Sequence, residues 1–244
     1  MNHSPKLLAH RGSVSEYSPE NTLASFQNAI DLGASAIETD VRATSDQVAV
    51  LIHDSNFRRI AKRDIKISNL TYEQAKLIEL TGGQHVISLA DALNWFPNAS
   101  FNIDIKSQDA IVATATAINE SKSWERVLIT SFSNRRRKKT IAKLDQPAAT
   151  SPGATLVLAI YIASLMPGTS LLRKLTKGLF AVQIPTNYSL LRLDSEKFIS
   201  KLHSVGLEVH YWVVNSQNEA VRLAAMGADA LVTDDITSIR AALI

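Results

Sequence analysis

The chain has 244 residues, of which 45% are apolar and 20% charged, so it can bury a large core and cannot be a disordered or fibrous protein. The formal net charge of +3 is too small to indicate nucleic acid as a partner, because nucleic-acid binding needs a strong positive field. The absence of cysteine excludes a disulfide framework and thiolate metal ligands.

The N-terminal sequence MNHSPKLLAHRG lacks an apolar run of signal-peptide length. Because the lack of cysteine also fits a reducing compartment, the sequence predicts a cytoplasmic protein. The longest apolar stretch covers only residues 154–166, which is short of the ~20 residues that a membrane-spanning helix needs. We therefore predict no transmembrane segment.

Short apolar runs alternate with longer amphipathic segments, which is typical of βα units around a parallel sheet. Strands are predicted, in chain order, at residues 7–10, 34–41, 101–106, 126–132, 147–150, 179–185, 206–214 and 229–233, with an extra strand at 47–52. Helices are predicted at residues 20–33, 88–96, 110–122, 133–144, 194–205, 216–225 and 236–243. An irregular segment with a short helix at 71–80 is predicted at residues 55–88.

Eight strands running in one direction, with a crossover between each pair, predict a TIM (β/α)8 barrel, a fold whose typical length is ~250 residues. A doubly wound sheet is the alternative. Because no repeat or low-complexity linker divides the chain, residues 1–244 are predicted to form a single domain with a small insertion at about 55–88, after the second strand region.

In such a barrel the active site lies at the carboxyl ends of the strands. Polar residues occupy these ends in the predicted pattern. They are, in chain order, His10, Arg11, Glu38, Asp40, His53, Asp104, Lys106, Ser131, Gln183, Trp212 and Asp234.

The acidic members of this set indicate a metal site. Glu38 and Asp40 share one face of a strand with Cα atoms ~6.6 Å apart, and Asp104 adds a third carboxylate from the neighbouring strand. Carboxylate oxygens are the ligands of hard cations, so Ca²⁺ or Mg²⁺ is favoured over zinc. The alternative is an acid pair at a solvated strand end.

The basic members indicate acid–base chemistry on an anionic substrate. His10 and His53 suit a pair in which one imidazole is neutral and the other protonated. Three carboxylates, a divalent cation, Arg11 and Lys106 leave the site with roughly one positive charge. That charge matches a monoanion such as a phosphodiester, whose growing transition-state charge the cations could stabilise.

Four short motifs carry a resemblance to a known family: HRG at 10–12, PENT at 19–22, ETD at 38–40 and HD at 53–54. In type, order and spacing they resemble the N-terminal signature of the glycerophosphodiester phosphodiesterases. The later segments NLTYEQAK, FNIDIK, YWVVN and ADALVTDD also resemble family segments, so the similarity covers the whole chain and is weakest at about 146–178.

The resemblance implies a TIM barrel with an insertion after HD, and hydrolysis of small-molecule glycerophosphodiesters to glycerol 3-phosphate and an alcohol. By position, Glu38, Asp40 and Asp104 would bind Ca²⁺ or Mg²⁺, although many members have Glu where this chain has Asp104. His10 and His53 would be catalytic, and Arg11 and Lys106 would contact the phosphate. Gln183 and Trp212 are expected to line the site because they lie at predicted strand ends. Either the glycerol 2-hydroxyl or water would attack the phosphorus. The preferred alcohol and the oligomeric state stay open.

Residues 146–178 leave two functional readings open. The simpler one is a buried helix and loop of the fifth βα unit. The other is an apolar lid edged by Arg173, Lys174 and Lys177, with transient membrane-surface contact through 154–177, which would suit a lysophospholipase D acting on acyl-bearing lipids. Besides glycerophosphodiester hydrolysis and lysophospholipase D activity, a third hypothesis for the whole chain is a non-catalytic barrel that binds phosphorylated ligands. The basic run RRRKK at 135–139 is predicted to be a solvated helix face.

Overall fold

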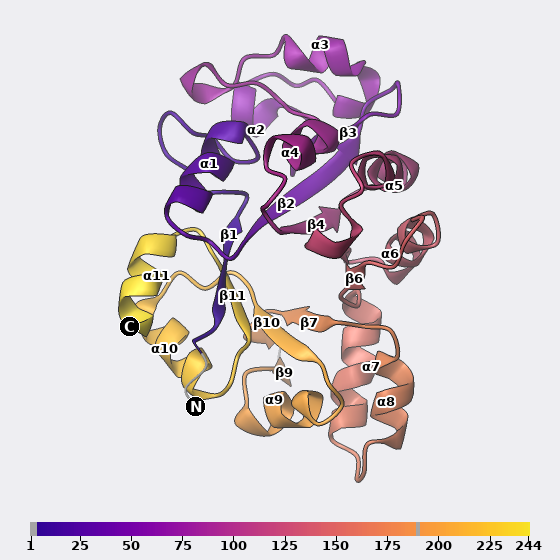
Figure 1. Cartoon of the computed structure of the whole chain (residues 1–244), viewed down its shortest axis with the longest axis vertical. Helices are drawn as coiled ribbons and strands as arrows, with labels where there is room; N and C mark the ends of the chain where they lie inside the picture. Colours follow the sequence, from indigo (N-terminus) through magenta and orange to yellow (C-terminus); the bar gives the residue numbers. More distant parts are fainter. Residues whose placement is uncertain (1–3, 189–190) are drawn as a thin grey trace.

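The computed structural model describes residues 4–188 and 191–244, and in these residues eight parallel strands curve into a barrel (Figure 1). The strands are β1 (Lys6–His10), β2 (Ala36–Ala43), β4 (Phe101–Ile105), β5 (Val127–Thr130), β6 (Ala149–Thr150), β7 (Ala181–Ile184), β10 (Glu208–Tyr211) and β11 (Ala230–Thr233). Their order is β6-β5-β4-β2-β1-β11-β10-β7.

The two end strands of this order, β6 and β7, lie next to each other and nearly close the barrel. The backbone N–H of Phe180, just before β7, donates to the carbonyl of Thr150 in β6 at 2.9 Å. The N–H of Gln183 donates to the hydroxyl of Ser151 at 3.2 Å. The predicted TIM barrel is therefore confirmed, and the doubly wound alternative is wrong.

Helices cover the outside of the barrel between successive strands (Figure 1). They are α1 (Leu23–Asp31), α4 (Leu89–Trp95), α5 (Ala110–Glu120), α6 (Asn134–Ile141), α7 (Ala154–Ser164), α8 (Ser170–Thr176), α9 (Glu196–His203), α10 (Gln217–Ala225) and α11 (Ile236–Leu243). Their starts follow from capping: α1 begins at Leu23, later than expected, because the Thr22 hydroxyl accepts from the Ser25 N–H.

The extra strand after β2, β3 (Ala49–Leu51), pairs with β2 in the antiparallel direction. Behind it, the insertion contains α2 (Arg58–Ala61), α3 (Tyr72–Lys76) and two short 3₁₀ turns (Ile67–Asn69 and Thr81–Gly83). The insertion and β3 share a small apolar core that includes Phe57, Ile67 and Val86. This core holds the segment that follows His53 against the barrel.

Two apolar layers between strands and helices form the main core. One lies beneath α1, α4 and α5 and includes Phe26, which packs edge-on against Phe101 at 5.9 Å between ring centroids. The other lies beneath α7, α9, α10 and α11. Among the described residues, a small apolar group around Leu8 and Val232 is separate from these two layers. Two residues further along the chain, His10 and Asp234 lie on the same side of the backbone, toward the carboxyl ends.

Residues 154–177 form the α7–α8 hairpin, which lies on the outside of the barrel (Figure 1). Ile160 and Ala163 of α7 are buried, but Leu158 and Ile162 are exposed, the latter by 55%. The segment is therefore only half-buried. It packs against the barrel through one side of α7 and leaves other apolar side chains of the same helix exposed. None of the helices in the described residues is both long and apolar enough to cross a membrane.

A two-stranded antiparallel ribbon lies between β7 and α9. It consists of β8 (Asn187–Tyr188) and β9 (Leu191–Arg192). The sequence did not predict it, because each strand has only two residues and no alternating apolar pattern.

Candidate active site

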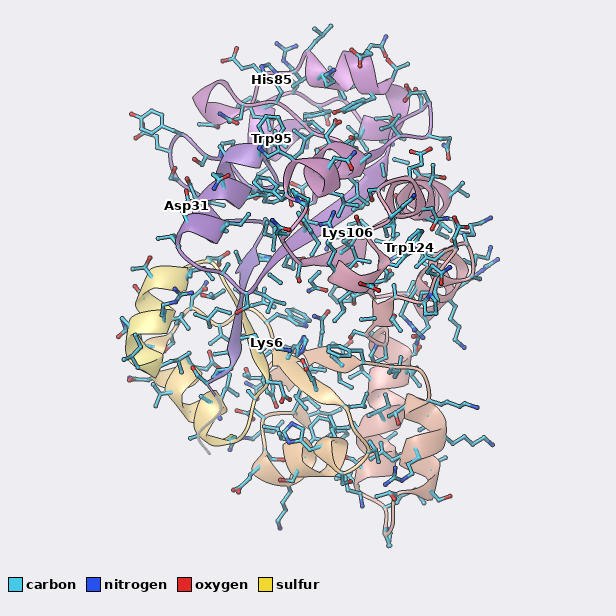
Figure 2. All side chains as sticks on the ribbon, viewed as in Figure 1. Lys6, Asp31, His85, Trp95, Lys106 and Trp124 are labelled. Carbon is cyan, nitrogen blue, oxygen red and sulfur yellow. The ribbon has the colours of Figure 1, made fainter. Side chains whose placement is uncertain are left out.

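The carboxyl ends of β1, β2 and β4 bring the predicted site residues together. In the strand register, His10 pairs with Glu38, and Asp40 pairs with Asp104. Alternate residues of a strand share a face, so these side chains enter the same end of the barrel. Lys106 follows directly after β4 and lies near the centre of the molecule (Figure 2).

Arg11 turns into the site from the loop after β1. Its φ is 60°, in the left-handed region, and that of Gly12 is 87°. A Cβ on Gly12 would lie 2.5 Å from the Ser25 hydroxyl oxygen, so only glycine fits there. The turn lets the Arg11 N–H donate to the Glu38 carbonyl at 2.9 Å, while its Nε lies 2.9 Å from the Asp40 carboxylate.

Lys106 lies between two of the three buried carboxylates. Its Nζ is 2.8 Å from Asp40 Oδ1 and 2.6 Å from Asp104 Oδ2. It also lies 5.8 Å from the ring centroid of Phe132. The chain therefore pairs its buried acids with its own cations, Lys106 and Arg11.

Burial and mutual repulsion make the three carboxylates titrate differently. The pKa of Glu38 is raised well above its usual range by burial and then by the charges of Asp40 and Asp104. Burial likewise raises the pKa of Asp104. Burial also acts to raise the pKa of Asp40, but Lys106 and Arg11 together lower it. The cluster thus has more acids than its two cations can neutralise.

Aspartates hold both histidines at the same ring nitrogen. His10 Nδ1 lies 2.7 Å from Asp234 Oδ1, and the other Asp234 oxygen accepts from the Asn215 side chain at 2.6 Å. His53 Nδ1 lies 2.8 Å from Asp54 Oδ1. With Nδ1 paired in this way, Nε2 is the nitrogen left for the substrate on each ring.

Both supporting aspartates are held ionised. The hydrogen bond from His10 lowers the pKa of Asp234, with a further contribution from Asn215. Burial acts to raise the pKa of Asp54, but hydrogen bonds from His53 and Arg59 lower it overall. Asp54, the second residue of the HD motif, thus contacts the predicted catalytic ring directly.

The donor set fits a divalent cation by its chemistry. As the side chains stand, no three acidic or histidine groups within the described ranges are gathered as metal ligands. However, Glu38, Asp40 and Asp104 are all buried, and Asp104 Oδ1 has no hydrogen-bond partner among the described residues. Burial, together with the charges of the neighbouring carboxylates, raises the pKa values of Glu38 and Asp104, and a hard cation would supply positive charge at this place.

The two predicted lining residues differ in their surroundings. Trp212 packs edge-on against Phe132 at 5.8 Å between ring centroids, and Phe132 in turn faces Lys106. The side chain of Gln183 contacts His210 Nδ1 at 3.2 Å on the neighbouring strand β10. Trp212 therefore adjoins the carboxylate cluster through Phe132, whereas Gln183 belongs to a polar contact between β7 and β10.

Two further polar residues support the site. Asn21, from the PENT motif, donates to Asp40 Oδ2 at 3.3 Å and accepts from the Thr39 hydroxyl at 2.7 Å. Arg136 donates through Nε to the carbonyl of Ile105 at 3.1 Å. The motif was the only sequence signal for Asn21, and nothing in the sequence distinguished Arg136 from its basic neighbours.

The expectation that residues 135–139 form a solvated face is wrong in part. Arg137 is only 5% exposed, and its Nη1 donates to the Thr150 hydroxyl at 3.1 Å. Arg135, Lys138 and Lys139 are exposed as expected. The side chains of α6 alternate between the barrel and solvent because the helix lies against β5 and β6.

Comparison with known proteins gives a consistent result. The model of the glycerophosphoryl diester phosphodiesterase family matches residues 10–238. A probable glycerophosphodiester phosphodiesterase 2 from Mycobacterium tuberculosis is 32% identical over 237 residues, covering 97% of this chain and 90% of that protein. Human lysophospholipase D GDPD1 is 25% identical over 275 residues, covering 96% of this chain and 85% of that protein.

Solved structures share the fold at lower identity. A glycerophosphodiester phosphodiesterase from Agrobacterium tumefaciens has a TM-score of 0.80 at 19% identity, with 98% of each chain covered. An Oleispira antarctica phosphodiesterase in complex with the product sn-glycerol-3-phosphate has a TM-score of 0.79 at 21% identity, covering 98% of this chain and 96% of that one.

Proposed function

The chain belongs to the glycerophosphoryl diester phosphodiesterase family, and on that premise we propose that it hydrolyses glycerophosphodiesters to glycerol 3-phosphate and an alcohol. One observation carries the proposal. Two histidines, each held at Nδ1 by an aspartate, come from the same end of the barrel as a buried cluster of carboxylates with Arg11 and Lys106.

A phosphodiester monoanion matches the charge of this site. Arg11 and Lys106 supply two cations at the barrel mouth, and both are largely buried, so their interaction with a phosphate is weakly screened. The Oleispira antarctica phosphodiesterase of similar fold, whose structure is a complex with the product sn-glycerol-3-phosphate, supports a glycerophosphate ligand. We assign Arg11 and Lys106 to the non-bridging phosphate oxygens.

His10 and His53 are assigned to proton transfer. One neutral ring accepts a proton from the attacking hydroxyl, either water or the glycerol 2-hydroxyl, as its oxygen bonds to phosphorus. The other ring, protonated, donates to the alcohol oxygen as its bond to phosphorus breaks. If the 2-hydroxyl attacks first, water then opens the cyclic phosphate with the two rings in exchanged roles.

Glu38, Asp40 and Asp104 are proposed to hold Ca²⁺ or Mg²⁺. When bound, the cation would stabilise negative charge on the phosphate oxygens during the reaction. Burial and the charges of Asp40 and Asp104 raise the pKa of Glu38 in the metal-free chain, and a bound cation would favour the ionised form of this carboxyl group. Lys106, which neutralises Asp40 and Asp104 in the free chain, would then be available to the substrate.

The assay that tests the function uses glycerophosphocholine and glycerophosphoethanolamine with the purified chain and Ca²⁺ or Mg²⁺. We expect release of glycerol 3-phosphate from both, measured by a coupled dehydrogenase assay. If neither diester is cleaved while glycerol 3-phosphate still binds, the chain is a non-catalytic phosphate-binding barrel instead.

A lysophospholipase D activity is the second candidate, and the α7–α8 hairpin favours it. Leu158, Ile162 and Leu165 form an exposed apolar stripe along α7, with Leu165 exposed by 69%. Between Asp145 and Asp194 the sequence has no acidic residue. The second helix of the hairpin and its C-terminal end carry exposed basic side chains, namely Arg173, Lys174 and Lys177. We propose that residues 154–177 contact an anionic membrane surface transiently, which would give access to acyl-bearing diesters.

Turnover of lysophosphatidylcholine and flotation with phosphatidylglycerol vesicles test this second candidate. We expect the pair Ile162→Ser and Leu165→Ser to abolish vesicle binding, because the apolar contact is lost. Val112→Ser is the control, since Val112 is 49% exposed on α5, away from the hairpin. Cleavage of both glycerophosphodiesters without any cleavage of lysophosphatidylcholine would exclude the second candidate.

We also propose that residues 1–244 act as a single domain in the cytoplasm. The continuous order of strands from β6 to β7, with the two ends joined by hydrogen bonds, supports a single domain. The lack of cysteine supports a reducing compartment.

A further inference from the structure

We propose that Arg59 is a positioning residue of the active site, which holds Asp54 and Glu20 and through them orients His53 and Arg11. The inference rests on the proposed function. It assigns a role in that function to the insertion, because Arg59 lies on α2 and outside the barrel proper.

The guanidinium of Arg59 is paired with two carboxylates at once. Its Nη1 and Nη2 donate to the two oxygens of Glu20 at 2.6 and 2.7 Å. Its Nε donates to Asp54 Oδ2 at 2.6 Å. Three N–H groups of one planar cation are thus directed at two acids, which restricts the orientation of both.

Each of these acids also contacts a residue assigned to the reaction. The second oxygen of Asp54 lies 2.8 Å from His53 Nδ1. The carboxylate of Glu20 accepts from Arg11 Nη1 at 3.3 Å. Arg59 therefore joins the loop after β1 to the loop after β3, and both of these strands pair with β2.

The arrangement serves orientation more than stability. Arg59 is 48% exposed, and partly exposed ion pairs contribute little to the free energy of unfolding. Glu20, in contrast, is only 16% exposed, so its carboxylate needs a well-placed partner. Without Arg59, Asp54 could rotate away from His53, and the ring would lose its defined direction.

The neighbouring Arg58 provides a matched control. It lies on the same helix, one residue earlier, and pairs with Asp64 on the surface of the insertion. Arg58 is 70% exposed and Asp64 62%. Its removal takes the same charge from the same helix without touching Glu20 or Asp54.

Steady-state kinetics of Arg59→Ala with glycerophosphocholine test the inference. We expect kcat to fall about 10- to 100-fold, because small errors in the placement of a catalytic group have effects of this size, and KM to change less than about threefold. Arg58→Ala should stay within about twofold of the unmodified chain in both constants. Arg59→Lys should recover only part of the loss, since an ammonium cannot contact both acids in one plane.

Chemical rescue distinguishes positioning from a structural role. Guanidinium at roughly 10–50 mM should raise the kcat of Arg59→Ala by replacing the missing group, and should leave His53→Ala and Arg58→Ala unchanged. An unchanged kcat in Arg59→Ala would overturn the inference. A loss of activity that follows lowered stability and resists guanidinium would also overturn it.

Histidine ring ¹⁵N NMR separates this inference from the proposed function. In the unmodified chain at about pH 8.5, His53 should carry its proton on Nδ1, and Arg59→Ala should shift it toward mixed tautomers. If the unmodified chain cleaves no glycerophosphodiester, the proposed function fails while this measurement still decides on Arg59. Identical His53 spectra in both chains would contradict the inference.

Discussion

His10→Ala and His53→Ala are each expected to lower kcat for glycerophosphodiesters by about 10³-fold, which corresponds to about 4 kcal/mol of transition-state stabilisation. In the proposed mechanism each ring would transfer a proton, in a geometry that neither water nor a neighbouring carboxylate would reproduce. The double variant should be little worse than either single one, because both rings act in the same step. Steady-state rates with glycerophosphocholine measure the effect.

His85→Ala is the control for these variants. His85 is exposed in the insertion, so its loss should leave the rate within about twofold. The rate of the unmodified chain should also show a bell-shaped pH dependence, since one ring must be neutral and the other protonated. Activity retained in the double variant, or a profile flat between about pH 5 and 9, would contradict paired histidine catalysis.

Removal of divalent cations with EDTA is expected to abolish activity, and Ca²⁺ or Mg²⁺ should restore it. Asp40→Asn and Glu38→Gln should each lower activity by about 10²-fold or more, because the buried carboxylates would no longer hold the cation. Asp31→Asn, a change at an exposed residue at the end of α1, should have no effect. Full activity in EDTA would defeat the proposed metal dependence.

Thermal unfolding gives a second measurement of cation binding, which does not depend on enzyme turnover. A cation at 100 times its Kd should stabilise the unmodified chain by about 2.7 kcal/mol and should stabilise Glu38→Gln much less. An unchanged cation effect in Glu38→Gln would remove Glu38 from the ligand set.

The sign of the Glu38 effect on the metal-free chain follows from its raised pKa. The folded chain binds this proton more tightly than the unfolded chain, so stability falls as pH rises from the unfolded pKa through the raised, folded one. Glu38→Gln cannot ionise and should escape this loss. We expect the metal-free variant to be at least as stable as the unmodified chain at the upper end of that range.

Much of the fold and of the candidate site could be predicted from the sequence. The strands at 7–10, 101–106 and 229–233 were recognisable because an apolar run bounded by turn residues is a local signal. Glu38 and Asp40 could be placed on one face of a strand by the twofold alternation alone. In a barrel the carboxyl ends of all strands lie at one face, so His10 at the end of the first strand could be placed near Glu38 and Asp40.

The support of these residues depended on the tertiary structure. Arg59 lies 39 residues from Glu20 in the sequence, and Asp234 lies 224 residues from His10. Neither pair leaves a periodic pattern, because each depends on the path of loops and not on the repeat of a strand or helix. For the same reason, the sequence did not show that Arg136 donates to the carbonyl of Ile105, a contact that its basic neighbours do not make.

The sequence by itself thus determined the eight barrel strands, most of the helices between them and the residue types at the strand ends, because local periodicity and turn chemistry encode these features. Only the tertiary structure decided that Lys106 lies between Asp40 and Asp104, and that an aspartate holds each histidine at Nδ1. The physical reason is that charge pairing acts through space, over a few ångströms, between groups that the chain brings together only when the barrel closes.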